Sequence, residues 1–226
     1  MSFQDILGLT FPPVAIAFRP TPSAGVPHVG TLGPAGCSYW RLAAEGKVFY
    51  TEAADHYNCP IGAYTHGVDL PAEKATELEG LVKTMVGLEY IKMEEVPNIP
   101  RRAAPFGVAM YGPLPGAPFT PDVVLLRGRA NQVMLVVEAA RMAGIGPDVG
   151  VRPRPTCAML PETMQTYRAT ISFGCIGNRV YTGLGDDELY VALPGHKLPD
   201  VVSKLATVVR ANRELEQFHR GRQATG

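Results

Sequence analysis

The pattern around the four cysteines occurs twice in this chain, and it restricts the possible folds more than any other feature. A Pro-x-Val-Gly segment ends seven residues before Cys37, and a second one ends seven residues before Cys157. Cys59 follows Cys37 by 22 residues and begins Cys-Pro-Ile-Gly-x-Tyr-Thr, whereas Cys175 follows Cys157 by 18 residues and begins Cys-Ile-Gly-x-x-x-Tyr-Thr. Each string is short, but the shared order and the similar spacing indicate a degenerate internal duplication.

Two halves of this kind predict a fold with an approximate two-fold axis. A Leu-Pro pair begins an amphipathic helix in each half, and an apolar strand precedes each cysteine block. We therefore expect one α/β (or α+β) domain over residues 1–226 with a degenerate pseudo-two-fold repeat. The half-repeats cover roughly 12–90 and 121–219, and the proline-rich segment 91–120 connects them.

The spacing of apolar residues and the positions of Pro and Gly predict the elements of this domain. We expect Asn131 to cap a helix that stops at Gly144, and residues 220–226 to fray. Each Ile-Gly pair is expected to form a turn. The predicted strands are 13–19, 47–52, 107–111, 122–127, 169–173 and 187–193, and the predicted helices are 37–44, 71–88, 131–144, 157–167 and 199–219.

Four cysteines delivered in pairs to one axis can form a site with four thiolate ligands. A helix N-terminus favours the thiolate, which is the form that binds metal, and the repeat places Cys37 and Cys157 near such ends. Four thiolates suit a [4Fe–4S] cluster, a [2Fe–2S] cluster or a structural zinc. Because the chain lacks the Cys-x-x-Cys pairs of small zinc modules, we expect a [4Fe–4S] cluster held by Cys37, Cys59, Cys157 and Cys175. Its role would be electron transfer or redox catalysis.

Three further residues are expected at the cofactor because they follow the second cysteine of a half. Gly62 and Gly177 allow the backbone to approach a sulfur and donate N–H groups to it. Arg179 can neutralise a negatively charged cluster or hold a substrate carboxylate. A surface position is the alternative for this arginine.

Other interpretations of the cysteines stay open. Cysteine is often buried, so the four can be packing residues without any cofactor. Cys59, close to His56 and His66 in the sequence, can be the nucleophile of a cofactor-free thiol enzyme. A histidine or a cysteine can also be the axial ligand of a haem or another tetrapyrrole. For both histidines a surface or loop role is the expectation.

The composition limits the partners and the compartment. The 21 basic and 21 acidic residues give a net charge of zero, without the basic excess that nucleic acid or an anionic membrane requires. No apolar run approaches the roughly 18 residues of a membrane span, and the N-terminus lacks the apolar region of a secretory signal. We therefore expect a cytoplasmic protein with reduced thiols. Its partner would be a redox protein or a small-molecule substrate, and the sequence permits a homo-oligomer.

The segments NCPIGAYTHG, PTCAMLPETMQ and FGCIGNRVYTGLGDDELYVALPG resemble the prokaryotic family catalogued as domain of unknown function 169. The resemblance extends from the segment PPVAIAF to the C-terminal helix. It implies an anaerobe-associated redox or metal protein and names no substrate. The cluster assignment therefore depends on the repeat.

Overall fold

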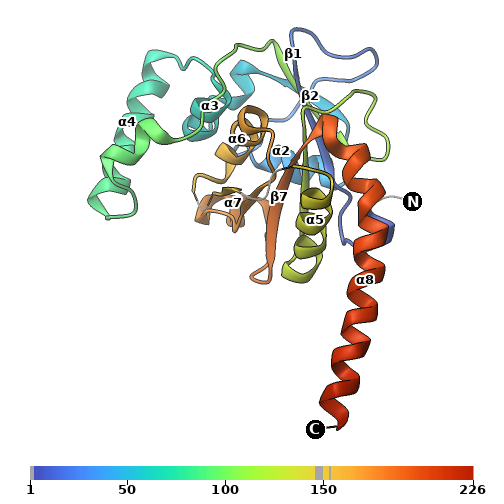
Figure 1. Ribbon diagram of the computed structural model, residues 1–226. Coiled ribbons are helices and arrows are strands. Elements are labelled where there is room, and N and C mark those ends of the chain that lie inside the picture. The colour runs from blue at the N-terminus through green and yellow to red at the C-terminus, as the bar shows by residue number, and fades with distance from the viewer. Residues whose placement is uncertain (1–2, 146–149, 153, 226) are drawn as a thin grey trace.

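The computed structural model describes residues 3–145, 150–152 and 154–225. Over these residues the chain forms one α/β domain around a seven-stranded sheet with the order β2-β3-β1-β4-β7-β6-β5 (Figure 1). The β5–β6 pair is parallel, and the other neighbouring strands are antiparallel. The strands are β1 (Val14–Arg19), β2 (Phe49–Glu52), β3 (Val108–Pro113), β4 (Val123–Arg129), β5 (Gly150–Val151), β6 (Thr170–Ser172) and β7 (Glu188–Pro194).

Helices connect the strands and cover both faces of the sheet. The α-helices are α1 (Phe3–Leu7), α2 (Ser38–Ala44), α3 (Pro60–His66), α4 (Ala72–Gly87), α5 (Ala130–Met142), α6 (Met159–Thr166), α7 (Ile176–Thr182) and α8 (Leu198–Thr225). Short 3₁₀ helices are η1 (Ala53–His56), η2 (Met93–Asn98), η3 (Thr156–Ala158) and η4 (Gly195–Lys197).

Alternate side chains of the central strands point to opposite faces of the sheet and divide the core into two layers. On one face, Val124 and Leu126 of β4 pack with α1, α5 and α8. On the other face, Ile16 of β1 and Leu125 of β4 pack with α2, α6 and Cys37. Figure 1 shows α5 and α8 beside each other, with α2, α6 and α7 grouped together. The cysteines accordingly belong to one face of the sheet.

Apart from the edge strand β5, which has no counterpart, two strands lie on each side of the central β1–β4 pair. Outward from β1 come β3 and β2, and outward from β4 come β7 and β6. Strand β2 lies between Cys37 and Cys59 in the chain, just as β6 lies between Cys157 and Cys175. This order agrees with the expected pseudo-two-fold repeat, and the repeat itself stays a prediction. Strand β3 lies within the segment predicted as a connection, and residues 147–149 of the second Pro-x-Val-Gly lie outside the described residues.

Every strand and helix expected from the apolar spacing is present, with ends shifted by a few residues. The capping prediction for Asn131 is wrong, because α5 begins at Ala130. Gln132 does the capping instead, since its side-chain oxygen accepts the backbone N–H of Arg129 at 2.8 Å. The fraying prediction is also wrong, because α8 continues to Thr225.

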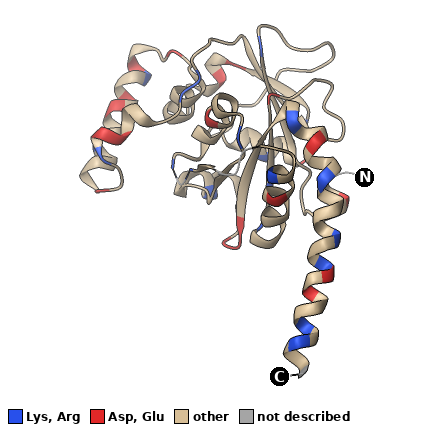
Figure 2. Cartoon of the chain, in the orientation of Figure 1, with Lys and Arg blue, Asp and Glu red and all other residues tan. Residues whose placement is uncertain are grey.

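Two helices extend beyond the sheet. Figure 1 shows α4 and the C-terminal half of α8 projecting from the body of the domain, and α4 buries none of its residues. Both basic and acidic residues occur along α8 (Figure 2), so neither sign of charge occupies the whole helix. Across the described part of the chain, no helix combines the length and the apolar character that crossing a bilayer requires.

Candidate functional site

All four cysteines lie at the beginning of a helix. Cys37, Cys59 and Cys175 are the residues immediately before α2, α3 and α7. Cys157 lies in η3, which leads directly into α6. The expected Ile-Gly turns are therefore wrong, because each Ile-Gly pair lies inside a short helix. The spacing of apolar residues does not reveal these two helices, because each has only seven residues. Each helix ends at a glycine in the left-handed conformation.

The four helix starts meet on one face of the sheet. Helix α2 packs against α7, and α3 packs against η3, so each half contacts the other at two places. An approximate two-fold axis that exchanges Cys37 with Cys157 and Cys59 with Cys175 would exchange these two contacts. These contacts join the helix that follows Cys37 to the helix that follows Cys175, and the helix that follows Cys59 to the turn that contains Cys157.

The thiols are close enough to influence one another electrostatically. The pKa of the Cys37 thiol is raised to about 12, chiefly by burial and then by negative charge on Cys59 and Cys175. The pKa of Cys157 is also raised, again chiefly by burial and then by the charge of Cys59. The residue Cys157 keeps some exposure, but its sulfur is surrounded by protein. Without a bound cation, these two thiols stay protonated at neutral pH.

Gly62 is required by the packing around Cys59. A Cβ at Gly62 would lie 2.9 Å from Cys59 Sγ and 3.9 Å from the Cα of Gly36, which precedes Cys37. Gly177, its expected counterpart, is open, because a Cβ there would meet only the ring of Tyr181 at 3.6 Å. Close approach of the backbone to sulfur is therefore present at Gly62, whereas Gly177 shows no such contact.

Asn178 brings an unused amide to the cysteines. It is only 2 % exposed, and neither its side-chain oxygen nor its nitrogen has a hydrogen-bond partner of normal geometry. The side chain faces Cys37, and its contact lowers the pKa of that thiol. A buried amide without partners is costly, and a thiolate at Cys37 would accept its N–H. The sequence could have indicated that Asn178 is close to the cysteines, because it lies one helical turn after Cys175.

The described residues contain no ready-made site for a single metal ion. Among residues 3–145, 150–152 and 154–225, no group of three or more His, Cys, Asp or Glu is placed to hold one. Zinc with four thiolates at about 2.3 Å would bring the sulfurs within roughly 3.8 Å of one another, whereas in an iron–sulfur cluster each thiolate binds a different iron. The assignment of a cluster therefore stays a prediction.

Arg179 forms hydrogen bonds that hold the loop before β7 against α7. It donates to the carbonyl oxygens of Phe173 at 2.7 Å and Gly185 at 2.9 Å, and it pairs with Asp186 at 2.8 Å. These bonds connect both ends of α7 to the loop that precedes β7. The guanidinium therefore supports the helix that begins at Cys175, and the expected contact with a cofactor stays a prediction.

The surface role expected for the two histidines is wrong. His56 and His66 are 0 % and 1 % exposed, with ring centroids 5.1 Å apart. Burial lowers the pKa of both, that of His66 to about 4. His66 Nδ1 donates to the carbonyl of Gly62 at 2.7 Å, and His56 Nε2 is 2.9 Å from Thr51 Oγ1. The sequence shows only that both histidines are close to Cys59. It does not show that both rings are buried in the core.

Neither histidine is hydrogen-bonded to Cys59. Among the residues that the structure describes, His56 Nδ1 and His66 Nε2 have no hydrogen-bond partner, and the other ring nitrogens bond Thr51 and Gly62. A thiolate nucleophile is commonly generated by a histidine within hydrogen-bond reach of the sulfur. The geometry thus lacks the pair on which the thiol-enzyme interpretation depends.

Comparisons with known proteins agree with the resemblance of the cysteine segments. The sequence profile of the DUF169 family, described as an uncharacterised ArCR, matches residues 2–204. An uncharacterized protein of Methanocaldococcus jannaschii is 29 % identical over an alignment 188 residues long, which covers 75 % of this chain and 75 % of the relative. No solved structure matches this chain. The profile covers the sheet, all four cysteines and the start of α8, and the chain therefore belongs to the DUF169 family.

Proposed function

We propose that this chain binds an iron–sulfur cluster, [4Fe–4S] in type, through Cys37, Cys59, Cys157 and Cys175. Two observations carry the proposal: each of the four cysteines lies at the start of a helix, and charge on Cys59 and Cys175 raises the pKa of Cys37. When bound, such a cluster supplies one-electron transfer. We propose that the protein acts in electron transfer or redox catalysis.

The surroundings of the thiols support this proposal. Helix N-termini direct unpaired N–H groups and a positive dipole end toward the thiolates. Asn178 adds a side-chain amide beside Cys37. Cys37, Cys59 and Cys157 belong to or pack against a core that includes Trp40 and Met159, and this apolar shell limits the access of water. Together these groups stabilise negative charge on sulfur.

Binding must release protons from the buried thiols. Because the pKa values of Cys37 and Cys157 are raised, both thiols lose a proton when they become ligands. Reconstitution of the cluster should therefore improve as the pH rises from 7 to 9. All four cysteines are free, as expected of a reducing compartment, and we propose a cytoplasmic location.

The alternatives have weaker support. A haem iron would have to reach a histidine nitrogen within the core, since His56 and His66 are almost fully buried. A thiol enzyme at Cys59 would act without a histidine bonded to the sulfur. A redox partner protein and a small-molecule substrate both stay compatible with a cluster at this position.

Single serine variants test the ligand set. The wild-type protein and the variants Cys37→Ser, Cys59→Ser, Cys157→Ser and Cys175→Ser are reconstituted anaerobically with iron and sulfide. Ala206→Ser on α8 is the control. We expect equal amounts of iron and acid-labile sulfide in the wild type and the control, and a large loss in every cysteine variant. If all four cysteine variants keep the iron and sulfide content of the wild type, the proposed ligands are wrong. If the protein instead contains stoichiometric zinc without sulfide, the four cysteines form a zinc site.

A further inference from the structure

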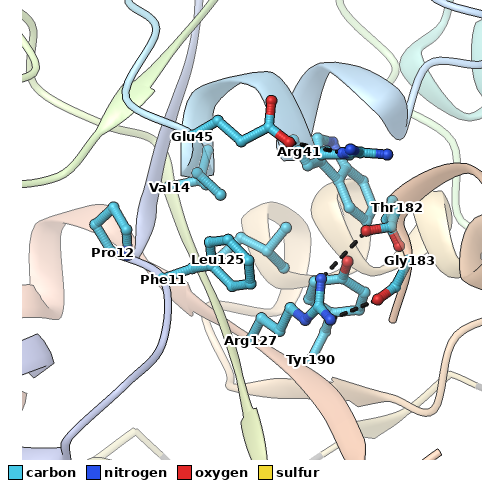
Figure 3. Close-up of a pocket in the computed structure, with 12 residues that line it drawn as sticks. Phe11, Pro12, Val14, Arg41, Glu45, Leu125, Arg127, Thr182, Gly183 and Tyr190 are labelled. Atoms are coloured by element: carbon cyan, nitrogen blue, oxygen red, sulfur yellow. Dashed lines mark hydrogen bonds and ion pairs between the residues drawn. The ribbon is translucent and has the colours of Figure 1, made fainter. Parts of the chain in front are cut away.

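A cavity of about 220 Å³ lies between the end of α2, strands β4 and β7, and the end of α7. Figure 3 shows Phe11, Pro12 and Leu125 on one side of this cavity, with Arg127 and Tyr190 below and Arg41 and Glu45 above. Its lining residues are Phe11, Pro12, Val14, Trp40, Arg41, Ala44, Glu45, Leu125, Arg127, Thr182, Gly183 and Tyr190.

Three aromatic residues, Phe11, Trp40 and Tyr190, line the cavity. The rings of Trp40 and Tyr190 meet edge to face with centroids 5.6 Å apart, and both residues are buried. Phe11 faces the guanidinium of Arg127 at 5.0 Å. Flat apolar walls of this kind favour a planar ligand, because aromatic rings stack or pack edge to face.

The charged groups at the cavity are paired with each other. Arg127 binds Glu188 and also donates to the carbonyl oxygens of Thr182 at 3.2 Å and Gly183 at 2.5 Å. At the rim, Arg41 pairs with Glu45 at 2.7 Å. A charged ligand would have to compete with these ion pairs, so the site favours a neutral molecule.

The volume sets the size of the ligand. A cavity of about 150 Å³ accommodates benzene. The space here, about 220 Å³, therefore suits a single substituted ring and is too small for a nucleotide cofactor.

The cavity adjoins the cysteine site. The backbone N–H of Trp40 donates to the carbonyl of Cys37 at 3.1 Å. The pKa of Tyr190 is raised to about 12, chiefly by burial, and the charge of Cys37 adds to this effect. Helices α2 and α7, which begin at Cys37 and Cys175, form two sides of the cavity. A molecule bound there would contact Trp40, which follows Cys37 by three residues, and Tyr190, which is influenced by the charge of Cys37.

We propose that this cavity binds the small-molecule substrate of the redox centre, and that the substrate is a neutral planar molecule with one ring. The role as a substrate depends on the proposed function, whereas binding does not. The two can fail separately, because binding is measured on protein without a cluster.

The single tryptophan of the chain, Trp40, reports on the cavity. Duroquinone, a neutral one-ring quinone, is titrated into the protein while tryptophan emission is recorded. Ala44→Phe fills the cavity from α2, and Phe11→Ala removes one aromatic wall. The matched control is Ala206→Phe, which changes an alanine that lines a separate groove beside α1.

We expect saturable quenching in the wild type and in Ala206→Phe. Ala44→Phe should raise the Kd at least tenfold, and Phe11→Ala should raise it several-fold. If Ala44→Phe does not fold, the Kd of Phe11→Ala is compared with that of the wild type instead. Quenching that never saturates, or an equal Kd in all folded variants, would overturn the inference. If the protein binds duroquinone saturably but never incorporates iron and sulfide, the cavity is a binding site. It is then not the substrate site of a cluster.

Discussion

The stability of the domain should depend on pH through His66, which lies in the core near Phe18 and His56. Its Nδ1 carries the proton, because it donates to the carbonyl of Gly62 at 2.7 Å. Its Nε2 has no partner, so a second proton would be buried without a hydrogen bond. Burial is the main cause that lowers the pKa of His66 to about 4, and the charge of Arg102 lowers it further.

The sign and the size of the effect follow from this pKa. In the unfolded chain a histidine titrates near pH 6.5, so between pH 6.5 and 4 the unfolded state binds the extra proton. The stabilisation is complete above pH 6.5 and is lost as the pH falls toward 4. His66 should therefore reduce the free energy of unfolding by about 1.4 kcal/mol from pH 8 to pH 5.5, and by about 2.6 kcal/mol at pH 4.5.

Urea denaturation at pH 8, 5.5 and 4.5 measures this dependence. His66→Gln should lower the stability at pH 8 but should weaken the loss of stability between pH 8 and pH 5.5 by roughly 1.4 kcal/mol. His219→Gln, at an exposed site on α8, should keep the dependence of the wild type. If His66→Gln and the wild type lose the same stability over this range, the assignment of a buried neutral imidazole is incorrect.

Two further predictions use matched pairs of variants and denaturation as the measurement. Gly62→Ala should destabilise the domain by about 1–3 kcal/mol, because its Cβ would lie 2.9 Å from Cys59 Sγ, whereas Gly177→Ala, with open space, should be neutral or slightly stabilising. Equal effects at the two glycines would mean that the chain does not pack on Cys59 in this way. Leu205→Ala, which empties a fully buried position of α8, should cost about 2–5 kcal/mol, and Leu215→Ala on the projecting part should change stability by less than about 0.5 kcal/mol. A large cost at Leu215 would show that a second surface covers this half of the helix.

Long elements with regular apolar spacing were predictable from the sequence. The strand at 13–19 and the first part of the helix at 199–219 each bury a continuous set of apolar side chains, and this burial produces the pattern that identifies them. Leu215 and Phe218, which continue the pattern, are exposed. Helices α3 and α7 were not predictable in this way, since seven residues with an internal glycine show too little periodicity.

The cysteine site stays a prediction. The structure places each cysteine at the start of a helix, but among residues 3–145, 150–152 and 154–225 no group of three or more His, Cys, Asp or Glu is placed to hold a metal ion. The burial of His56 and His66 could not be read from the sequence, because it depends on how α3 and η1 pack against β1 and β2. The amide of Asn178 became significant only when the contact of α7 with α2 placed it beside Cys37.

Purification from iron-replete cells under anaerobic conditions tests the proposed cluster most directly. Iron and acid-labile sulfide are quantified, and the visible absorption and the EPR spectrum after reduction with dithionite are recorded on the same sample. We predict a brown protein with equal amounts of iron and sulfide, a broad absorption that bleaches on reduction, and an EPR signal of a reduced cluster. A colourless protein without iron or sulfide, with four thiols free for alkylation after unfolding, would contradict the proposal.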